Sequence, residues 1–419
     1  MREDDGLRIW CQHHHPAAVQ RIHRRWWPHA ITAAACLLLA WHGAIVPVQA
    51  QGATDISAYD LIQEQIEAVP THDLEAFLQT LDADVQKYVP EFDLRRMVLD
   101  PEGGIRFNLS EMVGLLLSRL AHELIVGSAL LVQLVAVAIL AALLHSLATA
   151  FGNKGVHELA FLVAMMALLF LGVQTFRTAV DVANTSVGNM VGLMHALLPL
   201  MATLLAAVGG VTSAAIFHPM LVALVTGIAT LVQYVIFPLA FIGIIIAVVG
   251  KIAGDFPVDR LAGLARQWSM TMLGLCFIVF MAFLSVRGAI GPVADGLGVR
   301  AAKFLTGTFV PVIGSRIADA MEVVVGGSLL IKNAIGAFGM IAVFVITALP
   351  AVKLFSLLII FRVATALVEP VSEKRLVEAL NSLGDGLALV LACVLTTALM
   401  FYIAVTVLIT LGNVTVVMR

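Results

Sequence analysis

The segment KFLTGTFVPVIGSRIADAMEVVVGGSLLIK, from Lys303 to Lys332, is a polar stretch set between long apolar ones. We call residues 301–333 the polar island. Charge this close to lipid is costly unless it faces water or is covered by protein. The island is therefore where we look first for a polar path or a subunit contact. Its charged and helix-breaking residues are the candidate site: Lys303, Pro311, Gly314, Arg316, Asp319, Glu322 and Lys332.

Composition indicates an integral membrane protein. Of the 419 residues, 60% are hydrophobic and 13% are charged, and the mean hydropathy is +0.97. Soluble domains have about 25% charged residues. The formal net charge of -3, with Lys and Arg scattered singly through the apolar part, gives no basic face for nucleic acid.

The apolar part predicts an all-α polytopic protein with six to eight spans, because a span needs about 20 mostly apolar residues. Some spans are expected to be broken or re-entrant, with a split at Pro238 and a hairpin of short helices that meets at Pro350. The clearest candidates are Leu124–Ala150, Leu159–Phe176, Trp268–Val286 and Leu387–Leu411, and the less regular ones are Met190–Ile216, Pro219–Val249, Ala334–Pro350 and Lys353–Val368.

Basic residues leave the orientation open. Loops 250–267 and 287–333 are both rich in Lys and Arg, yet they flank the single span Trp268–Val286. Positive loops favour the cytoplasmic side. Either that bias fails here, or part of the polar island enters the bilayer and returns.

Residues 1–50 have the pattern of a secretory signal peptide. A basic region precedes the apolar run Ile31–Leu39, and the segment closes on Val46-Pro47-Val48-Gln49-Ala50. We predict cleavage between Ala50 and Gln51, which places the mature N-terminus outside the cytoplasm. The alternative is an uncleaved signal anchor.

Residues 51–110 are predicted to form an acidic, extracytoplasmic helical segment, followed by a membrane domain over residues 111–419. The segment contains twelve acidic residues and four basic ones. It has two apolar stripes, which pack on each other, on the membrane domain or on another protein. Ile62, Ile66 and Val69 form the first stripe; Leu74, Phe77, Leu78 and Leu81 form the second, with Thr71 as its cap and Pro70 and Pro90 as its bounds.

Motifs for catalysis are incomplete or missing in the sequence. His122-Glu123 and His157-Glu158 begin like zinc-protease helices, but the second histidine is absent from each. Asp385, in Gly384-Asp385-Gly386, is expected to cap the last helix or to lie in a solvated loop before it. We find no phosphate-binding loop, nucleophile elbow or dinucleotide fingerprint. We therefore expect no catalytic, cofactor-binding or metal-binding residues, and a protein that is not an enzyme.

Within the polar island, Arg316, Asp319 and Glu322 recur every three residues and share one face of a helix. One interpretation is an interfacial amphipathic helix with its charged face in water. The other is that this face lines a polar path or a subunit contact, with the island's Gly and Pro residues allowing a broken helix.

The sequence resembles the stage III sporulation protein AE family over essentially the whole mature chain, most specifically from about Val286 onward. The residues that carry the resemblance are Lys303-Phe304, Thr306-Gly307, Phe309–Gly314, Asp319-Ala320, Leu330–Asn333, Pro350–Lys353, Thr410–Thr415 and Met418-Arg419.

The resemblance implies a membrane subunit of the apparatus that endospore-forming bacteria build between mother cell and forespore. It implies residence in the outer forespore membrane. The implied partners are the other stage III sporulation A proteins and, across the intermembrane space, stage II sporulation protein Q. That apparatus is similar to specialised secretion systems and is thought to act as a channel. Three functions stay open: a subunit of a channel or export platform, a non-conducting scaffold of the same complex, and a self-sufficient secondary transporter.

Overall fold

The chain divides between Asp55 and Ile56 into two units, and only the second is described here, from a computed structural model. The described backbone covers residues 56–100, 109–150, 154–253, 259–309 and 314–417. Side chains of residues 287–322 lie outside the description, although much of that stretch is helical.

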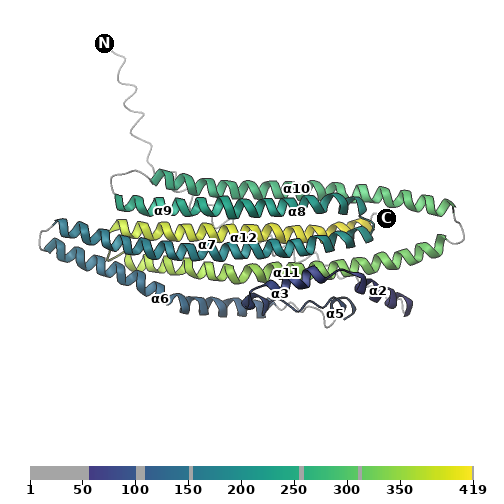
Figure 1. Cartoon of the computed structure of the whole chain (residues 1–419), viewed down its shortest axis with the longest axis horizontal. Coiled ribbons are helices and arrows are strands. Elements are labelled where there is room, and N and C mark those ends of the chain that lie inside the picture. Colours follow the sequence, from purple (N-terminus) through teal and green to yellow (C-terminus); the bar gives the residue numbers. More distant parts are fainter. Residues whose placement is uncertain (1–55, 101–108, 151–153, 254–258, 310–313, 418–419) are drawn as a thin grey trace, which may run out of the picture. The chain divides into compact units, whose positions relative to one another are not determined.

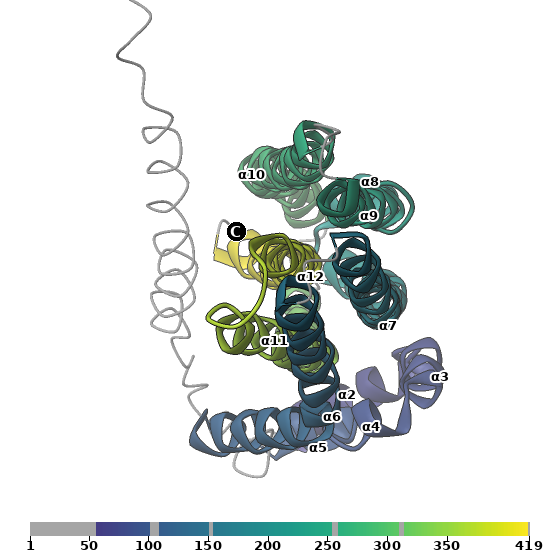
Figure 2. The ribbon, with the colours of Figure 1, turned by 90° about the vertical axis from the view of Figure 1, so that its left-hand side faces the viewer.

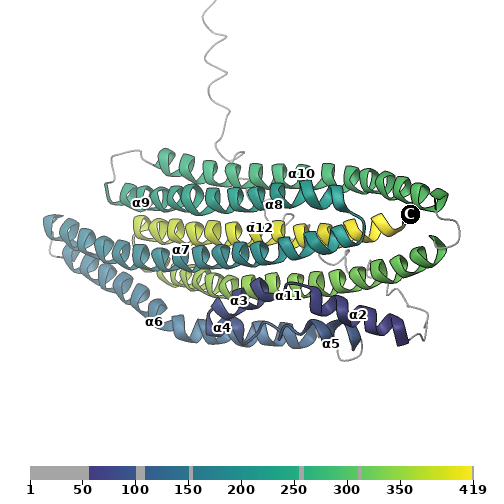
Figure 3. The same ribbon diagram turned by 45° about the vertical axis from the view of Figure 1, so that its right-hand side comes forward.

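Long antiparallel helices form the membrane domain, and the described residues contain no strand (Figures 1 and 3). Six helical stretches are long and apolar enough to cross a membrane. This confirms the predicted all-α polytopic membrane protein. The helices are α6 (Leu109–Ala150), α7 (Lys154–Ala207), α8 (Val211–Leu231) continuing through the π-helical turn η2 (Val232–Ile236) into α9 (Phe237–Ala253), α10 (Asp259–Phe309), α11 (Gly314–Val368) and α12 (Lys374–Val417).

Two of the breaks expected at prolines do not occur. Helix α11 runs straight through Pro350, so the predicted hairpin is wrong. Proline has no N–H to bond the carbonyl four residues earlier, which here is that of Ile346. The hydroxyl of Ser186 in α7 lies 3.5 Å from this oxygen and donates to it. The segment is not split into two half-helices at Pro238, since the π-helical turn η2 directly precedes this residue and the helix continues into α9.

The predicted span Met190–Ile216 is also wrong. It was expected to be one segment, but it contains a turn between two helices. Helix α7 ends at Ala207 and α8 begins at Val211. Between them Gly209 has φ +100°, a left-handed conformation that favours glycine. The Gly210 N–H donates to the carbonyl of Leu205, which satisfies an end group of α7.

The helices are far longer than a bilayer is thick. Helix α7 has 54 residues and α11 has 55, which makes each ~80 Å long, against a hydrocarbon core of ~30 Å. The two basic ranges expected to be loops are mostly helical, since 259–267 and 287–309 belong to α10 and 314–333 belongs to α11. The described backbone of 259–309 and 314–368 contains no re-entrant turn.

The acidic segment is helical, as its periodicity predicts. It contains α2 (Ile56–Ala68), α3 (His72–Thr80), α4 (Ala83–Gln86) and α5 (Leu94–Leu99). Thr71 is the N-cap residue of α3, but its hydroxyl donates to Oε1 of Glu75 at 2.7 Å and accepts no main-chain hydrogen bond. The second helix ends at Thr80, well before Pro90, because the short helix α4 follows it.

The apolar stripes of the acidic segment pack on the membrane domain of the same chain. Helices α2 and α5 contact α11, and α3 contacts α7. The ring of Phe92 meets that of Phe338 edge-on, with centroids 4.8 Å apart. Phe77 fills the space above Gly192, leaving no room there for a Cβ atom. The acidic segment thus lies on the flank of α7 and α11 (Figure 3).

Replacing Phe77 with alanine is expected to loosen α3 from α7. Phe77 is only half-buried, so the loss should be about 1–2 kcal/mol, below the cost of truncating a fully buried ring. Limited proteolysis of the purified full chain should then cut between α2 and α5 faster than in the wild type. The exposed Gln79→Ala variant is the control. Equal cleavage rates for both variants would show that Phe77 does not hold the segment.

Candidate functional site: a charged cluster where α12 begins

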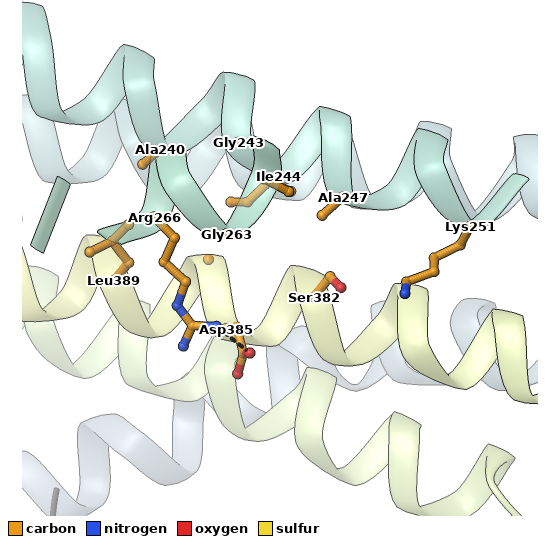
Figure 4. A pocket seen from close by; sticks show the side chains of 12 residues that line it. Ala240, Gly243, Ile244, Ala247, Lys251, Gly263, Arg266, Ser382, Asp385 and Leu389 are labelled. Carbon is orange, nitrogen blue, oxygen red and sulfur yellow. Dashed lines mark hydrogen bonds and ion pairs between the residues drawn. The ribbon is translucent and has the colours of Figure 1, made fainter. Parts of the chain in front are cut away.

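Charged side chains gather at one end of the bundle, where α9 and α11 end and α10 and α12 begin. Seen end-on, α12 lies between α11 on one side and α9 and α10 on the other (Figure 2). Its first turns therefore meet four other helices, α7, α9, α10 and α11. Asp385 of α12 is the centre of this cluster (Figure 4).

Asp385 binds two arginines at once. Its Oδ2 accepts from Nη1 of Arg266 in α10 at 2.6 Å, and its Oδ1 accepts from Nη2 of Arg362 in α11 at 2.5 Å. Nη1 of Arg362 also donates to Oδ1 of Asn381 at 3.1 Å. All three ionic side chains are about one third to one half exposed, at 45%, 44% and 33%. One carboxylate thus joins α10, α11 and α12 and leaves an excess positive charge.

A second ion pair lies two turns earlier on α12. Nζ of Lys251, in the last turn of α9, is 2.9 Å from Oε2 of Glu378. Lys374, four residues before Glu378, approaches the same carboxylate at 3.9 Å. The end of α9 is therefore tied to α12 by charge as well as by packing.

The expectation that Asp385 caps the last helix or lies in a solvated loop is wrong. Helix α12 begins at Lys374, so Asp385 lies in its interior. The two glycines beside it serve packing. Gly386 has no room for a Cβ because Ile244 of α9 occupies that place, and Gly384 lies against the guanidinium of Arg362. The pattern in the sequence that could have indicated this site is a carboxylate between two glycines, directly before a long apolar run.

A cavity of about 170 Å³ lies beside the cluster, between α9, α10 and α12 (Figure 4). Its charged and polar walls are Lys251, Arg266, Ser382 and Asp385, and small residues leave it hollow. A Cβ on Gly263 would have no atom within 4 Å. The cavity thus combines basic groups with apolar walls.

The predicted site residues belong to two consecutive helices. Lys303 belongs to the end of α10, whereas Gly314, Arg316, Asp319, Glu322 and Lys332 belong to α11. The side chains of the island before Val323 lie outside the described residues, as do Pro311 and the predicted cleavage site Ala50–Gln51.

Lys332 is the predicted site residue whose side chain is described, and it is fully buried at 0% exposure. Its Nζ donates to the carbonyl oxygens of Leu408 at 3.1 Å and Ile409 at 2.7 Å in α12. Among the described side chains no carboxylate pairs with it. Lys332 therefore joins α11 to α12 at a level remote from the Asp385 cluster.

The Asp385 cluster and the buried Lys332 can bind anions or hold helices together. The Asp385 cluster presents guanidinium groups, which recognise carboxylates and phosphates through paired hydrogen bonds. Within the described part of the chain, no group of three His, Cys, Asp or Glu side chains could hold a metal ion.

Comparison with known proteins gives one family. The family model for stage III sporulation protein AE matches residues 92–412. The chain is also 31% identical over 363 residues to stage III sporulation protein AE of Bacillus subtilis (strain 168), covering 87% of this chain and 91% of that protein. No solved structure matches. The chain belongs to the stage III sporulation protein AE family.

Proposed function

We propose that this protein is a non-enzymatic membrane subunit that lines a water-filled passage in the stage III sporulation A complex, linking mother cell and forespore. Family membership supports a role in sporulation. The proposed partners are the other stage III sporulation A proteins and stage II sporulation protein Q. Support for the passage comes from exposed charges on α7 and the apolar surface of α8 and α9.

The observation that carries the proposal is a pair of exposed charges on α7 beside the charge-free part of α8 and α9. Arg177 and Asp181 on α7 are both exposed. Directly before them, Phe176 stacks on Phe241 of α9 with centroids 5.7 Å apart. Directly after them, the carbonyl of Asn184 accepts from Nε2 of Gln233 at 3.1 Å. The two charges therefore lie level with residues 233–241.

That level is inside the most apolar stretch of the chain. Residues 211–250 contain no Asp, Glu, Lys or Arg, and on α8 and α9 they expose apolar side chains such as Ile242 at 51%. Charged side chains inside a bilayer face protein interiors or water-filled cavities. The α8–α9 side thus suits lipid, while the turn of α7 from Arg177 to Asp181 suits water.

A group of helices with one surface suited to lipid and another suited to water is what we expect of a subunit that lines a passage. We base the proposed orientation on the end of the bundle where the described side chains are rich in Lys and Arg, namely Lys251, Arg260, Arg266, Arg362, Lys374 and Arg375. Positive residues favour the cytoplasmic side. We propose that this end faces the mother-cell cytoplasm, in the outer forespore membrane, with the mature N-terminus outside the cytoplasm.

The transporter hypothesis loses its support, because it rested on helices broken at Pro238 and Pro350. Both prolines lie in continuous helical stretches. A non-conducting scaffold remains the alternative that the experiment must separate.

The test is cysteine accessibility in sporulating cells, in a chain whose native cysteines are replaced by alanine. Asp181→Cys should react with a small polar thiol reagent, whereas Ile242→Cys at the same level should not. Attaching a bulky reagent to Asp181→Cys should then stop forespore gene expression while the complex stays assembled. Normal expression with a fully labelled Asp181→Cys would favour the scaffold. If Asp181→Cys does not react with the polar reagent, the surface of α7 at this position is not exposed to water and the proposal is wrong.

A further inference from the structure

We infer that the cavity between α9, α10 and α12 is a binding site for a phosphate-bearing anion, in which the Arg266 guanidinium contacts the phosphate. The anion is either the head group of an anionic phospholipid or free phosphate. This site is separate from the face of α7 in the proposed passage, and the inference does not depend on that function.

The guanidinium of Arg266 has donors to spare. An arginine carries five N–H groups, and among the described residues Arg266 forms one hydrogen bond, from Nη1 to Asp385. Asp385 is shared with Arg362, so the carboxylate cannot neutralise both arginines. Asp385 fixes the Arg266 guanidinium at the cavity wall while leaving its other donors and a net positive charge available to an anion.

The cavity provides space next to those donors. It measures about 170 Å³ and is bordered by Arg266, Lys251 and the hydroxyl-bearing Ser382. The small residues Gly243, Ala247 and Gly263 keep it open. A phosphate group therefore has room beside the Arg266 guanidinium, and Lys251, which is ion-paired with Glu378, also borders the cavity. Basic pockets of this kind bind lipid head groups between membrane helices.

Its level along the helices suits a lipid head group. Charge-free apolar runs begin directly after Arg266 on α10 and after Asp385 on α12, since residues 267–286 and 386–411 contain no Asp, Glu, Lys or Arg. Trp268, just after Arg266, is 58% exposed, and tryptophan is enriched at the membrane–water interface. The acyl chains of a lipid held here would follow the apolar surface of α9 and α10.

Two variants of the full-length protein in detergent test the site. Arg266→Gln removes the donor, and Gly263→Leu fills the cavity at a position with no atom nearby. The matched controls lie on the same helix. Arg260→Gln removes an exposed arginine that does not line the cavity, and Gly274→Leu adds the same side chain at another glycine with open space around it.

Native mass spectrometry should follow retention of phosphatidylglycerol, with phosphatidylcholine as the neutral lipid and inorganic phosphate as the lipid-free anion. Both test variants should bind phosphatidylglycerol at least about tenfold more weakly than the wild type, while both controls bind it normally. Binding of inorganic phosphate, but not phosphatidylglycerol, that depends on Arg266 would assign the site to the free anion. The proposal would be overturned if both test variants bound the two anions as tightly as the wild type does. It would also be overturned if the wild type retained phosphatidylcholine as well as phosphatidylglycerol.

Discussion

Replacing Lys332 with glutamate is expected to lower the free energy of unfolding by at least about 3 kcal/mol, which is the scale of an uncompensated buried charge. The site is fully buried, and it presents two main-chain carbonyl oxygens at 3.1 and 2.7 Å to the Lys332 ammonium. A carboxylate has no proton to donate to these oxygens. It would either repel them or take up a proton at a further cost. The detergent-purified variant should unfold at a much lower temperature than the wild type or fail to accumulate.

Lys332→Met separates charge from packing. Methionine keeps the length and apolar stem of lysine, and the carbonyls of Leu408 and Ile409 keep their bonds within α12. We expect the change in stability to stay within about 1 kcal/mol. Thermal unfolding of both variants, side by side, is the measurement. Equal unfolding temperatures for the glutamate and methionine variants would show that Lys332 is not buried as described.

Replacing Asp385 with alanine is expected to cost about 2–3 kcal/mol, somewhat less than for a fully buried ion pair because water screens this half-exposed cluster. Arg266 and Arg362 would then lie near each other without their shared carboxylate. Three helices meet at Asp385, so the loss should appear as a lower unfolding temperature of the whole membrane domain.

A second substitution tests the cause. The double variant Asp385→Ala with Arg362→Leu removes the repulsion and should recover part of the lost stability, so the two effects should not add. Glu369→Ala, an exposed carboxylate at the same end of the bundle, is the control and should change stability by about 0.5 kcal/mol or less. Simple additivity in the double variant would indicate that the arginines are solvated and independent.

Local patterns in the sequence predicted the fold class and the helices of the acidic segment. Apolar content and the scarcity of charge are enough to indicate a helical membrane protein. The spacing of Ile62 and Ile66, and that of Leu74 and Phe77, predicted α2 and α3 because a helical stripe is a property of neighbours along the chain. The motifs from Lys303 onward likewise identified the family.

Helix ends and charge partners were decided by tertiary contacts. Helix α11 continues through Pro350, and Ser186, 164 residues earlier in the chain, donates to the carbonyl of Ile346 that the proline leaves without its N–H partner. Asp385 is a shared ion-pair partner because α10 and α11 bring arginines to it. Hydropathy measures how readily a segment leaves water, but it does not contain the position of the donor or acceptor that covers a polar group. The sequence by itself therefore determined that this protein is helical and lies in a membrane, whereas tertiary contacts decided which charged side chains pair, because those partners come from distant parts of the chain.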